Sequence, residues 1–164
     1  MPRLYLFRHG LAVPQGTQGI DDDDRPLTSK GERRVRQVAR SLKRLGLKPE
    51  VIVTSPLLRA RKTAEIAAGV LDLAYRLEEA DILRPTSSPD QIRGWLAGRT
   101  ESRLMLVGHN PNLSELLTLL TTGAPSPPLV EIRKAGVAAL RDDPAGRYVV
   151  DWITRPRLVR RLSE

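Results

Sequence analysis

The chain has 164 residues, a formal net charge of +8 and no cysteine. This length fits one domain over residues 1–164 that is large enough to bury a hydrophobic core. The missing cysteines exclude disulfides, thiol nucleophiles and thiolate metal sites. No apolar run reaches the length of a transmembrane helix, and no signal peptide is evident, so we expect a cytoplasmic protein. The positive charge favours acidic partners such as phosphate groups, although most of the basic side chains are expected to be solvated surface charges.

Strand and helix signals alternate from the N-terminus. An apolar run over 4–7 predicts the first strand. Ser29 and Glu32 have the spacing of a capping box and predict a helix that starts near Thr28. Gly46 follows the last apolar position of that helix and is expected to end it.

The next elements repeat this alternation. Residues 51–53 predict a short buried strand. Ser55 is expected to be the N-cap and Pro56 the first residue of a helix that runs to about Ala68. A weaker strand is predicted over 74–77.

A third helix and a fourth strand are predicted beyond residue 85. Ser88 and Gln91 have capping-box spacing and predict a helix start. An apolar run over 104–107 predicts a buried strand, and a helix is expected from about Asn112 to Leu120, before Gly123.

The last third of the chain changes character after a proline-rich break. Strands are predicted over 130–132, 137–140 and 148–153, and a turn over 142–146 joins the last two. The whole pattern predicts an α/β fold: a three-layer α/β/α sandwich with a mostly parallel central sheet and an antiparallel edge.

Polar side chains with phosphate chemistry follow three of the predicted strands. Arg8 and His9 follow the first strand, Ser55 follows the second and leads to Arg59, and His109 follows the fourth. Ligands bind at the carboxyl ends of strands in open α/β sheets, so we expect these side chains to converge there. Guanidinium groups match phosphate oxygens, and the starts of the two following helices can add backbone N–H donors. Ser55 itself is expected to act first as a helix cap.

Four motifs occur in order along the chain: Arg8-His9-Gly10, the segment 22–28 (DDDRPLT), the segment 55–64 (SPLLRARKTA) and the segment 108–111 (GHNP). Together they resemble the histidine phosphatase superfamily, which has the phosphoglycerate-mutase-like fold. The short length and the segment 22–28 resemble its SixA-type phosphohistidine phosphatases. Each motif alone is weak, but four in order at strand-to-helix junctions are specific.

This resemblance implies a role for each matched side chain. His9 would be the nucleophile and form a phosphohistidine intermediate, while Arg8, Arg59 and His109 would bind the phosphoryl group. A nucleophilic His9 needs a neutral attacking nitrogen, so its other nitrogen should donate to a fixed acceptor. Arg8, Arg59 and a protonated His109 would stabilise the transferring oxygens, and water would then attack the phosphoenzyme. Since these cations supply the charge, we expect no metal and no cofactor.

The general acid is left open. Larger family members use a carboxylic acid to protonate an alcohol leaving group, and two groups of carboxylates are candidates here. These are Glu78, Glu79 and Asp81 after the third predicted strand, and the run Asp21 to Asp24 after the first. A phosphohistidine substrate relaxes the need for an acid, because an imidazole leaving group can arrive protonated on its ring.

The favoured function is therefore a metal-independent phosphatase for phosphohistidine in a protein, such as a histidine phosphotransfer domain, with phosphate as product. The alternatives are a broad phosphomonoesterase for small phosphorylated metabolites and a non-catalytic module that binds phosphate or nucleic acid. Arg61, Lys62 and the tail Arg155 to Arg161 are expected to be solvated. That tail lacks the interleaved aromatic residues of a nucleic-acid site. Trp95 and Trp152 are expected in the core.

Overall fold

The computed structural model describes residues 3–145 and 147–157, and six strands form one sheet within them. The strands are β1 (Arg3–Arg8), β2 (Val51–Thr54), β3 (Leu77–Glu79), β4 (Arg103–Gly108), β5 (Val137–Asp142) and β6 (Tyr148–Ile153). Their order is β3-β2-β4-β1-β5-β6. The first four in this order are parallel, β5 is antiparallel to β1, and β6 is antiparallel to β5. The predicted mostly parallel sheet with an antiparallel edge is confirmed.

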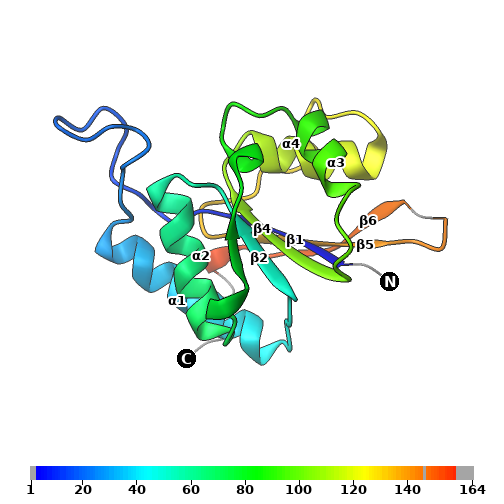
Figure 1. Cartoon of the computed structure of the whole chain (residues 1–164), viewed down its shortest axis with the longest axis horizontal. Helices are drawn as coiled ribbons and strands as arrows, with labels where there is room; N and C mark the ends of the chain where they lie inside the picture. Colours follow the sequence, from blue (N-terminus) through cyan, green and yellow to red (C-terminus); the bar gives the residue numbers. More distant parts are fainter. Residues whose placement is uncertain (1–2, 146, 158–164) are drawn as a thin grey trace.

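Four α-helices cover the two faces of this sheet (Figure 1). They are α1 (Ser29–Arg44), α2 (Leu58–Val70), α3 (Pro89–Leu96) and α4 (Asn112–Thr122), with short 3₁₀ helices at Ala74–Arg76 and Asp81–Leu83. The pair α1 and α2 packs on one face, and α3 and α4 pack on the other. The three-layer α/β/α sandwich is therefore confirmed. None of the described helices combines the length and the apolar character needed to cross a membrane.

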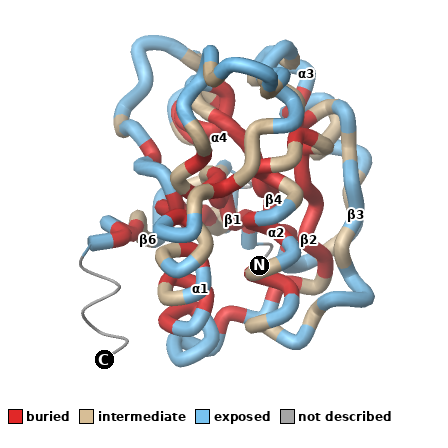
Figure 2. Tube along the Cα trace, turned by 90° about the vertical axis from the view of Figure 1, so that its left-hand side faces the viewer, coloured by how far each residue is buried: buried red, intermediate tan, exposed pale blue. Residues whose placement is uncertain are grey.

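The core follows from the alternation of side chains along buried strands. In β1, Tyr5 and Phe7 join the apolar cluster under α1 and α2, whereas Leu4 and Leu6 join the cluster under α3 and α4. Figure 2 shows that β1 and β4 run through the buried centre of the molecule. Strands buried on both faces hold the polar residues that follow them in fixed positions.

The ends of α1 refine the expected capping. Thr28 is the N-cap, and its side chain accepts a hydrogen bond from the Gly31 backbone N–H at 3.0 Å. The expected Ser29–Glu32 capping box is therefore wrong by one residue. A Cβ on Gly31 would lie 2.1 Å from the Leu11 carbonyl oxygen, so only glycine allows α1 to pack this closely on the segment that leaves β1.

The helix C-terminus is as expected. Gly46 has φ +76°, and its N–H donates to the Lys43 carbonyl while that of Leu47 donates to the Leu42 carbonyl. These two bonds form a Schellman motif, which uses carbonyls left free at the end of the helix. The predicted capping box of Ser88 and Gln91 at the start of α3 is also confirmed.

Two expectations differ from the structure, and a third extends beyond the described residues. Ser55 is not an N-cap, because α2 begins only at Leu58 and its N-cap is Leu57. The predicted strand over 74–77 is a 3₁₀ helix up to Arg76, and the strand β3 begins at Leu77. The expected turn over 142–146 ends at Gly146, which lies outside the described residues.

The predicted strand over 130–132 is also wrong. The backbone N–H of Ile132 donates to the Ser114 hydroxyl of α4 at 3.0 Å, and the Ile132 carbonyl accepts from the side chains of Arg8 and Asn110. Since side chains use these backbone groups, the segment does not join the ladder. It runs instead along the end of β1.

Candidate active site

Three neighbouring strands bring the expected site residues to one edge of the sheet. In the order β2-β4-β1, Thr54 is level with Val107, and Gly108 is level with Arg8. The ladder continues one step further, because the His9 N–H donates to the Gly108 carbonyl at 3.0 Å. The chain thus leaves all three strands at the same level.

His9 holds one ring nitrogen as a donor. Its Nδ1 lies 2.7 Å from the carbonyl oxygen of Gly10. A carbonyl can only accept, so Nδ1 carries the proton and Nε2 keeps its lone pair. Burial lowers the pKa of His9 to about 3, against the opposing effect of the Gly10 hydrogen bond, and the charges of Arg59 and Arg8 lower it further. The ring is therefore neutral at pH 7, in the tautomer that a nucleophile needs.

His109 lies beside His9, with 5.1 Å between the ring centroids. Its Nε2 is 2.8 Å from the Ser55 hydroxyl oxygen, which itself accepts from the Leu57 N–H at 3.4 Å. The Ser55 hydroxyl finds no other acceptor for its proton among the described residues, so it donates to Nε2, and the His109 proton sits on Nδ1. This Nδ1 is buried and has no hydrogen-bond partner among the described residues.

The charge state of His109 differs from the expectation. Burial lowers its pKa to about 2, and repulsion from His9 and Arg59 acts in the same direction. The ligand-free ring is therefore neutral at pH 7, not protonated. It still offers an N–H donor, because Ser55 occupies the other nitrogen.

Arg59 is buried, with 3% of its surface exposed, and a loop carboxylate binds it. Its Nη1 donates to the Asp22 carbonyl at 2.6 Å, and its Nη2 donates to the Asp22 carboxylate at 3.1 Å. Its Nε is buried without a partner among the described residues. The loop between β1 and α1 thus orients this guanidinium and leaves its Nε–H available.

Arg8 is held from the opposite side of the site by the segment that follows α4. Its Nη1 donates to the Glu131 carboxylate at 3.0 Å and to the Ile132 carbonyl at 2.9 Å. Its Nε is also buried and unpartnered within the described chain. Sequence reasoning did not find Glu131 as a partner, because 123 residues separate the two positions.

Thr63 connects two of the elements that carry site residues. Its hydroxyl accepts from the Gly10 N–H at 3.0 Å and donates to the Arg59 carbonyl at 2.7 Å. This fully buried residue fixes the turn after His9 against the first turn of α2. The sequence signal was its place in the segment 55–64, one helical turn after Arg59.

The comparisons with known proteins agree with this geometry. A family model described as histidine phosphatase superfamily (branch 1) matches residues 4–84. An uncharacterized protein of Picosynechococcus is 41% identical over 145 residues, which cover 87% of this chain and 86% of that protein. The phosphohistidine phosphatase SixA of Escherichia coli is 26% identical over 157 residues, 94% of each chain. This chain belongs to the histidine phosphatase superfamily.

Solved structures of phosphatases extend the match. A structure of the protein histidine phosphatase SixA complexed with tungstate has a TM-score of 0.82 at 25% identity, covering 96% of this chain and 99% of that one. A mycobacterial glucosyl-3-phosphoglycerate phosphatase has a TM-score of 0.73 at 18% identity, covering 92% and 97%. The first supports phosphatase activity in this chain, and the second shows the shared fold.

The structure shows which of the candidate general acids of this histidine phosphatase contacts the site. Asp22 alone among them contacts one of the four site side chains, through its bonds to Arg59. Although burial opposes it, the guanidiniums of Arg59 and Arg25 lower the pKa of the Asp22 carboxyl. An ionised carboxylate has no proton to give, so Asp22 is suited to orient Arg59 rather than to protonate a leaving group.

The other candidates pair elsewhere or make no bond to the site within the described chain. Glu78 pairs with Arg99, Glu79 with Arg61, Asp81 with Arg84, and Asp23 also with Arg84. Asp21 and Asp24 make no side-chain hydrogen bond or ion pair to Arg8, His9, Arg59 or His109.

The start of α2 contributes fewer free backbone donors than expected. At the start of α2, the Leu57 N–H donates to Ser55 and the Leu58 N–H donates to the Asp23 carbonyl. These amides are therefore already used by the protein.

The remaining expectations concern residues outside this cluster. Arg61 and Lys62 lie exposed on α2 and pair with Glu65. Trp95 and Trp152 pack, partly buried, against the two apolar clusters. In the described residues, no three His, Asp or Glu side chains gather into a group that could hold a metal ion.

Proposed function

We propose that this chain acts as a single histidine phosphatase domain over residues 1–164 that removes phosphate from phosphohistidine in a protein. His9 is the nucleophile. The observation that carries the proposal is the bond from His9 Nδ1 to the Gly10 carbonyl, because it leaves Nε2 neutral and available in a site of cationic and N–H donors.

Arg8, Arg59 and His109 bind the phosphoryl group. Each keeps one buried N–H without a partner among the described residues: Nε of the two arginines and Nδ1 of the histidine. Buried donors without partners are costly unless an acceptor arrives, and a phosphoryl group supplies three acceptor oxygens. Because the ring is already held by Ser55, His109 can donate without being protonated first.

The reaction then proceeds in two balanced steps. The His9 Nε2 lone pair forms a bond to phosphorus as the P–N bond of the substrate breaks. The substrate imidazole keeps the proton on its other nitrogen and leaves neutral, while His9 keeps its Nδ1 proton and becomes a phosphorylated imidazolium. Water next attacks phosphorus as the bond from phosphorus to His9 Nε2 breaks. The two protons of the water go to phosphate and solvent, His9 keeps its Nδ1 proton, and the ring returns as neutral imidazole.

The preference for a P–N bond rests on the missing general acid. An imidazole that is already protonated on its ring leaves without help, whereas an alkoxide needs a proton. Asp22 is the carboxylate bonded to the site, and its lowered pKa keeps it ionised. The likeness to SixA phosphohistidine phosphatases supports the same choice.

A kinetic panel tests the substrate class. We expect a higher kcat/KM for a phosphorylated histidine domain than for small phosphate esters, and a steep fall among the esters as the leaving-group pKa rises. A flat series, with alkyl esters hydrolysed as fast as the phosphoprotein, would assign the chain to small metabolites. Binding of phosphate without any turnover would assign it to the non-catalytic modules.

His9→Ala tests the nucleophile. We expect activity at the background level and no acid-labile, base-stable phosphoenzyme after rapid quenching with labelled substrate, because no nitrogen remains to take the phosphoryl group. Unchanged circular dichroism and thermal unfolding would show an intact fold. Near-normal turnover by this variant would contradict the assignment.

A further inference from the structure

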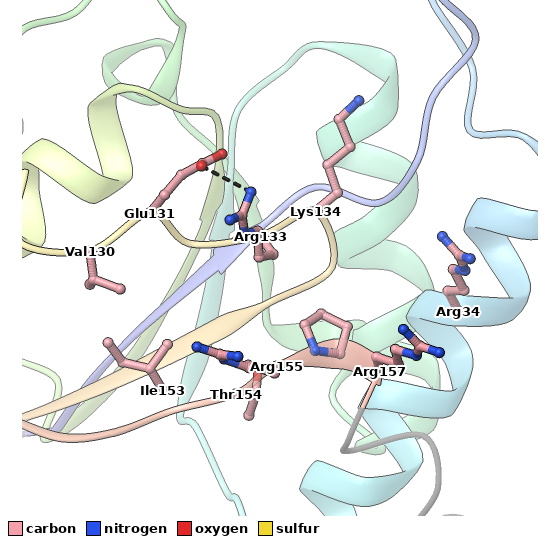
Figure 3. A pocket seen from close by; sticks show the side chains of 10 residues that line it. Arg34, Val130, Glu131, Arg133, Lys134, Ile153, Thr154, Arg155 and Arg157 are labelled. Carbon is pink, nitrogen blue, oxygen red and sulfur yellow. Dashed lines mark ion pairs between the residues drawn. The ribbon is translucent and has the colours of Figure 1, made fainter.

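A groove of about 700 Å³ lies beside the active site and is formed by three segments that are far apart in the sequence (Figure 3). Arg34 comes from α1, Arg133 and Lys134 come from the segment before β5, and Arg155 and Arg157 follow β6. Five cationic side chains thus line one hollow, and Glu131 is the only acidic residue that lines it.

Most of these cations have no carboxylate partner among the described residues. Arg133 pairs with Glu131 at 3.1 Å, whereas Arg34, Lys134, Arg155 and Arg157 make no ion pair with any carboxylate of residues 3–145 and 147–157. Some exposed arginines elsewhere pair locally, as Arg93 does with Asp90 and Arg147 with Asp143, whereas others, such as Arg36 and Arg40 on α1, also make no ion pair within the described residues. The groove therefore concentrates positive charge that the described chain does not neutralise.

The groove borders the phosphate site, because Glu131 lines the groove and also binds Arg8. Glu131 binds Arg133 in the groove and Arg8 in the site, with distances of 3.1 Å and 3.0 Å. The Ala135 N–H donates to the carbonyls of Arg8 and His9, so the segment that lines the groove lies directly beside the nucleophile. The charge of Lys134 also contributes to lowering the pKa of His9. A chain bound in the groove would thus lie next to the reacting phosphoryl group.

The lining favours an acidic polypeptide over a nucleic acid. Val130, Ile153 and Pro156 add apolar surface between the cations, which suits the mixed side chains of a peptide. The lining contains no aromatic side chain, and proteins that bind single-stranded nucleic acids usually stack bases on aromatic rings.

We propose that this groove binds an acidic segment of the protein substrate, close to its phosphohistidine, and so selects acidic phosphoproteins. This proposal rests on the proposed function, since it names the kind of substrate that the same site receives. Charge complementarity beside a small reactive site mainly raises the rate of productive encounter, and salt weakens it.

The test compares two phosphohistidine peptides that differ only in their flanking residues, acidic in one and neutral in the other. We expect wild-type kcat/KM to be about tenfold higher for the acidic peptide at ~0.01 M salt, and this preference to shrink at ~0.15 M salt. The double variant R34E/R155E should lose the preference. Neither of these two arginines is among the charges that lower the pKa of His9 or His109.

K48E/R76E is the matched control. Both of these exposed residues lie just before the amino ends of strands, β2 and β3, so the variant carries the same change in net charge at the opposite edge of the sheet. It should keep the wild-type preference. An equal preference for the acidic peptide in wild type and both variants would contradict the proposed role of the groove and leave the proposed function intact.

Binding of the unphosphorylated acidic peptide, measured by fluorescence anisotropy, separates the two proposals. If neither the wild type nor a variant hydrolyses either peptide, the proposed function fails, but anisotropy still tests whether the groove binds acidic peptides. Loss of peptide binding in R34E/R155E alone supports that role of the groove, and equal binding by all proteins contradicts it. Tighter binding of a single-stranded oligonucleotide than of the peptide, lost in the same variant, would overturn it in favour of nucleic acid.

Discussion

The two edges of the central sheet both carry arginines, but in different surroundings. At the carboxyl edge, Arg8, Arg59 and His109 each leave a buried N–H without a partner among the described residues. At the amino edge, Arg3 pairs with Asp151 at 3.8 Å and Arg103 pairs with Glu50 at 3.1 Å. Arginines form ion pairs at both edges, but at the carboxyl edge Arg8 and Arg59 also keep a buried Nε–H without a partner among the described residues.

The difference between the edges lies in burial as well as in pairing. Arg59 is almost completely buried, whereas about half of the Arg3 and Arg103 side chains is exposed. Water solvates an exposed guanidinium and makes its ion pair worth little. A buried donor that lacks a partner instead gains from any anion that enters. The carboxyl edge therefore differs from the amino edge in its buried donors without partners, and not in its number of charges.

The largest effect should come from removing one of these donors. Arg59→Ala is expected to lower kcat/KM by about 10²-fold, because a preorganised charge that faces the phosphoryl group is lost. Arg61→Ala, on the same helix but exposed, and Arg103→Ala, at the amino edge, should change it little. Steady-state kinetics of the three variants check this, and equal losses at Arg59 and Arg61 would show that the wrong face of α2 was assigned.

The two buried histidines should make stability depend on pH. Burial lowers the pKa of His9 to about 3 and that of His109 to about 2, whereas an unfolded histidine titrates near ~6.5. Between pH ~3 and ~6.5 the unfolded chain therefore binds more protons than the folded one. The free energy of unfolding rises with pH in this window and falls on acidification, by about 1.4 kcal/mol per pH unit for each histidine.

Urea unfolding at several pH values checks this sign. His109→Asn should flatten the curve of unfolding free energy between pH ~4 and ~6 relative to wild type, because one of the two groups is gone. The carboxylates that also titrate there are common to both proteins and cancel in the difference. Parallel curves would mean that His109 is as easily protonated in the folded protein as in the unfolded chain.

The contact between Asp22 and Arg59 gives a smaller effect. Asp22→Asn keeps an oxygen that accepts from Arg59 but removes a negative charge that repels a bound dianion. We expect inorganic phosphate to inhibit this variant at about tenfold lower concentration. Asp24→Asn, in the same loop without a bond to Arg59, is the control. Loss of turnover on alkyl esters alone in Asp22→Asn would instead identify Asp22 as the general acid.

The sequence predicted the elements that carry a local signal. Buried strands such as 104–107, the capping box at Ser88 and the stop at Gly46 depend on neighbouring residues, and the structure confirms them. The convergence of Arg8, His9, Arg59 and His109 followed from strand ends, which meet at one edge of a parallel sheet.

The errors arose where distant side chains decide the local structure. Residues 130–132 have the apolar pattern of a strand, but the Ile132 N–H donates to the Ser114 hydroxyl instead of to a neighbouring strand. The sequence offered Asp22 as one of several candidate general acids, and only the fold shows that its carboxylate binds Arg59. The groove combines Arg34 with residues near 133 and 155, and no spacing in the sequence connects these positions.

Substitution of Ser55 has the smallest expected effect on activity, and it tests how the His109 donor at the carboxyl edge is positioned. The pattern of Ser55 with Pro56 predicted a helix cap, yet its hydroxyl lies 2.8 Å from His109 Nε2. With no other acceptor for its proton among the described residues, the hydroxyl donates to Nε2, which keeps the His109 proton on the unpartnered Nδ1. In Ser55→Ala nothing selects this tautomer, so only part of the molecules present the donor to phosphate.

We therefore expect Ser55→Ala to lower kcat/KM about fivefold, the size of one net hydrogen bond, and to weaken inhibition by phosphate or tungstate in proportion. Ser41→Ala is the matched control, because Ser41 is a buried serine of α1 whose hydroxyl donates to the Gln37 carbonyl. A role in folding alone would lower the unfolding temperature of both variants and leave oxyanion inhibition unchanged. A parallel loss of turnover and oxyanion affinity in Ser55→Ala alone would place the effect on the His109 donor.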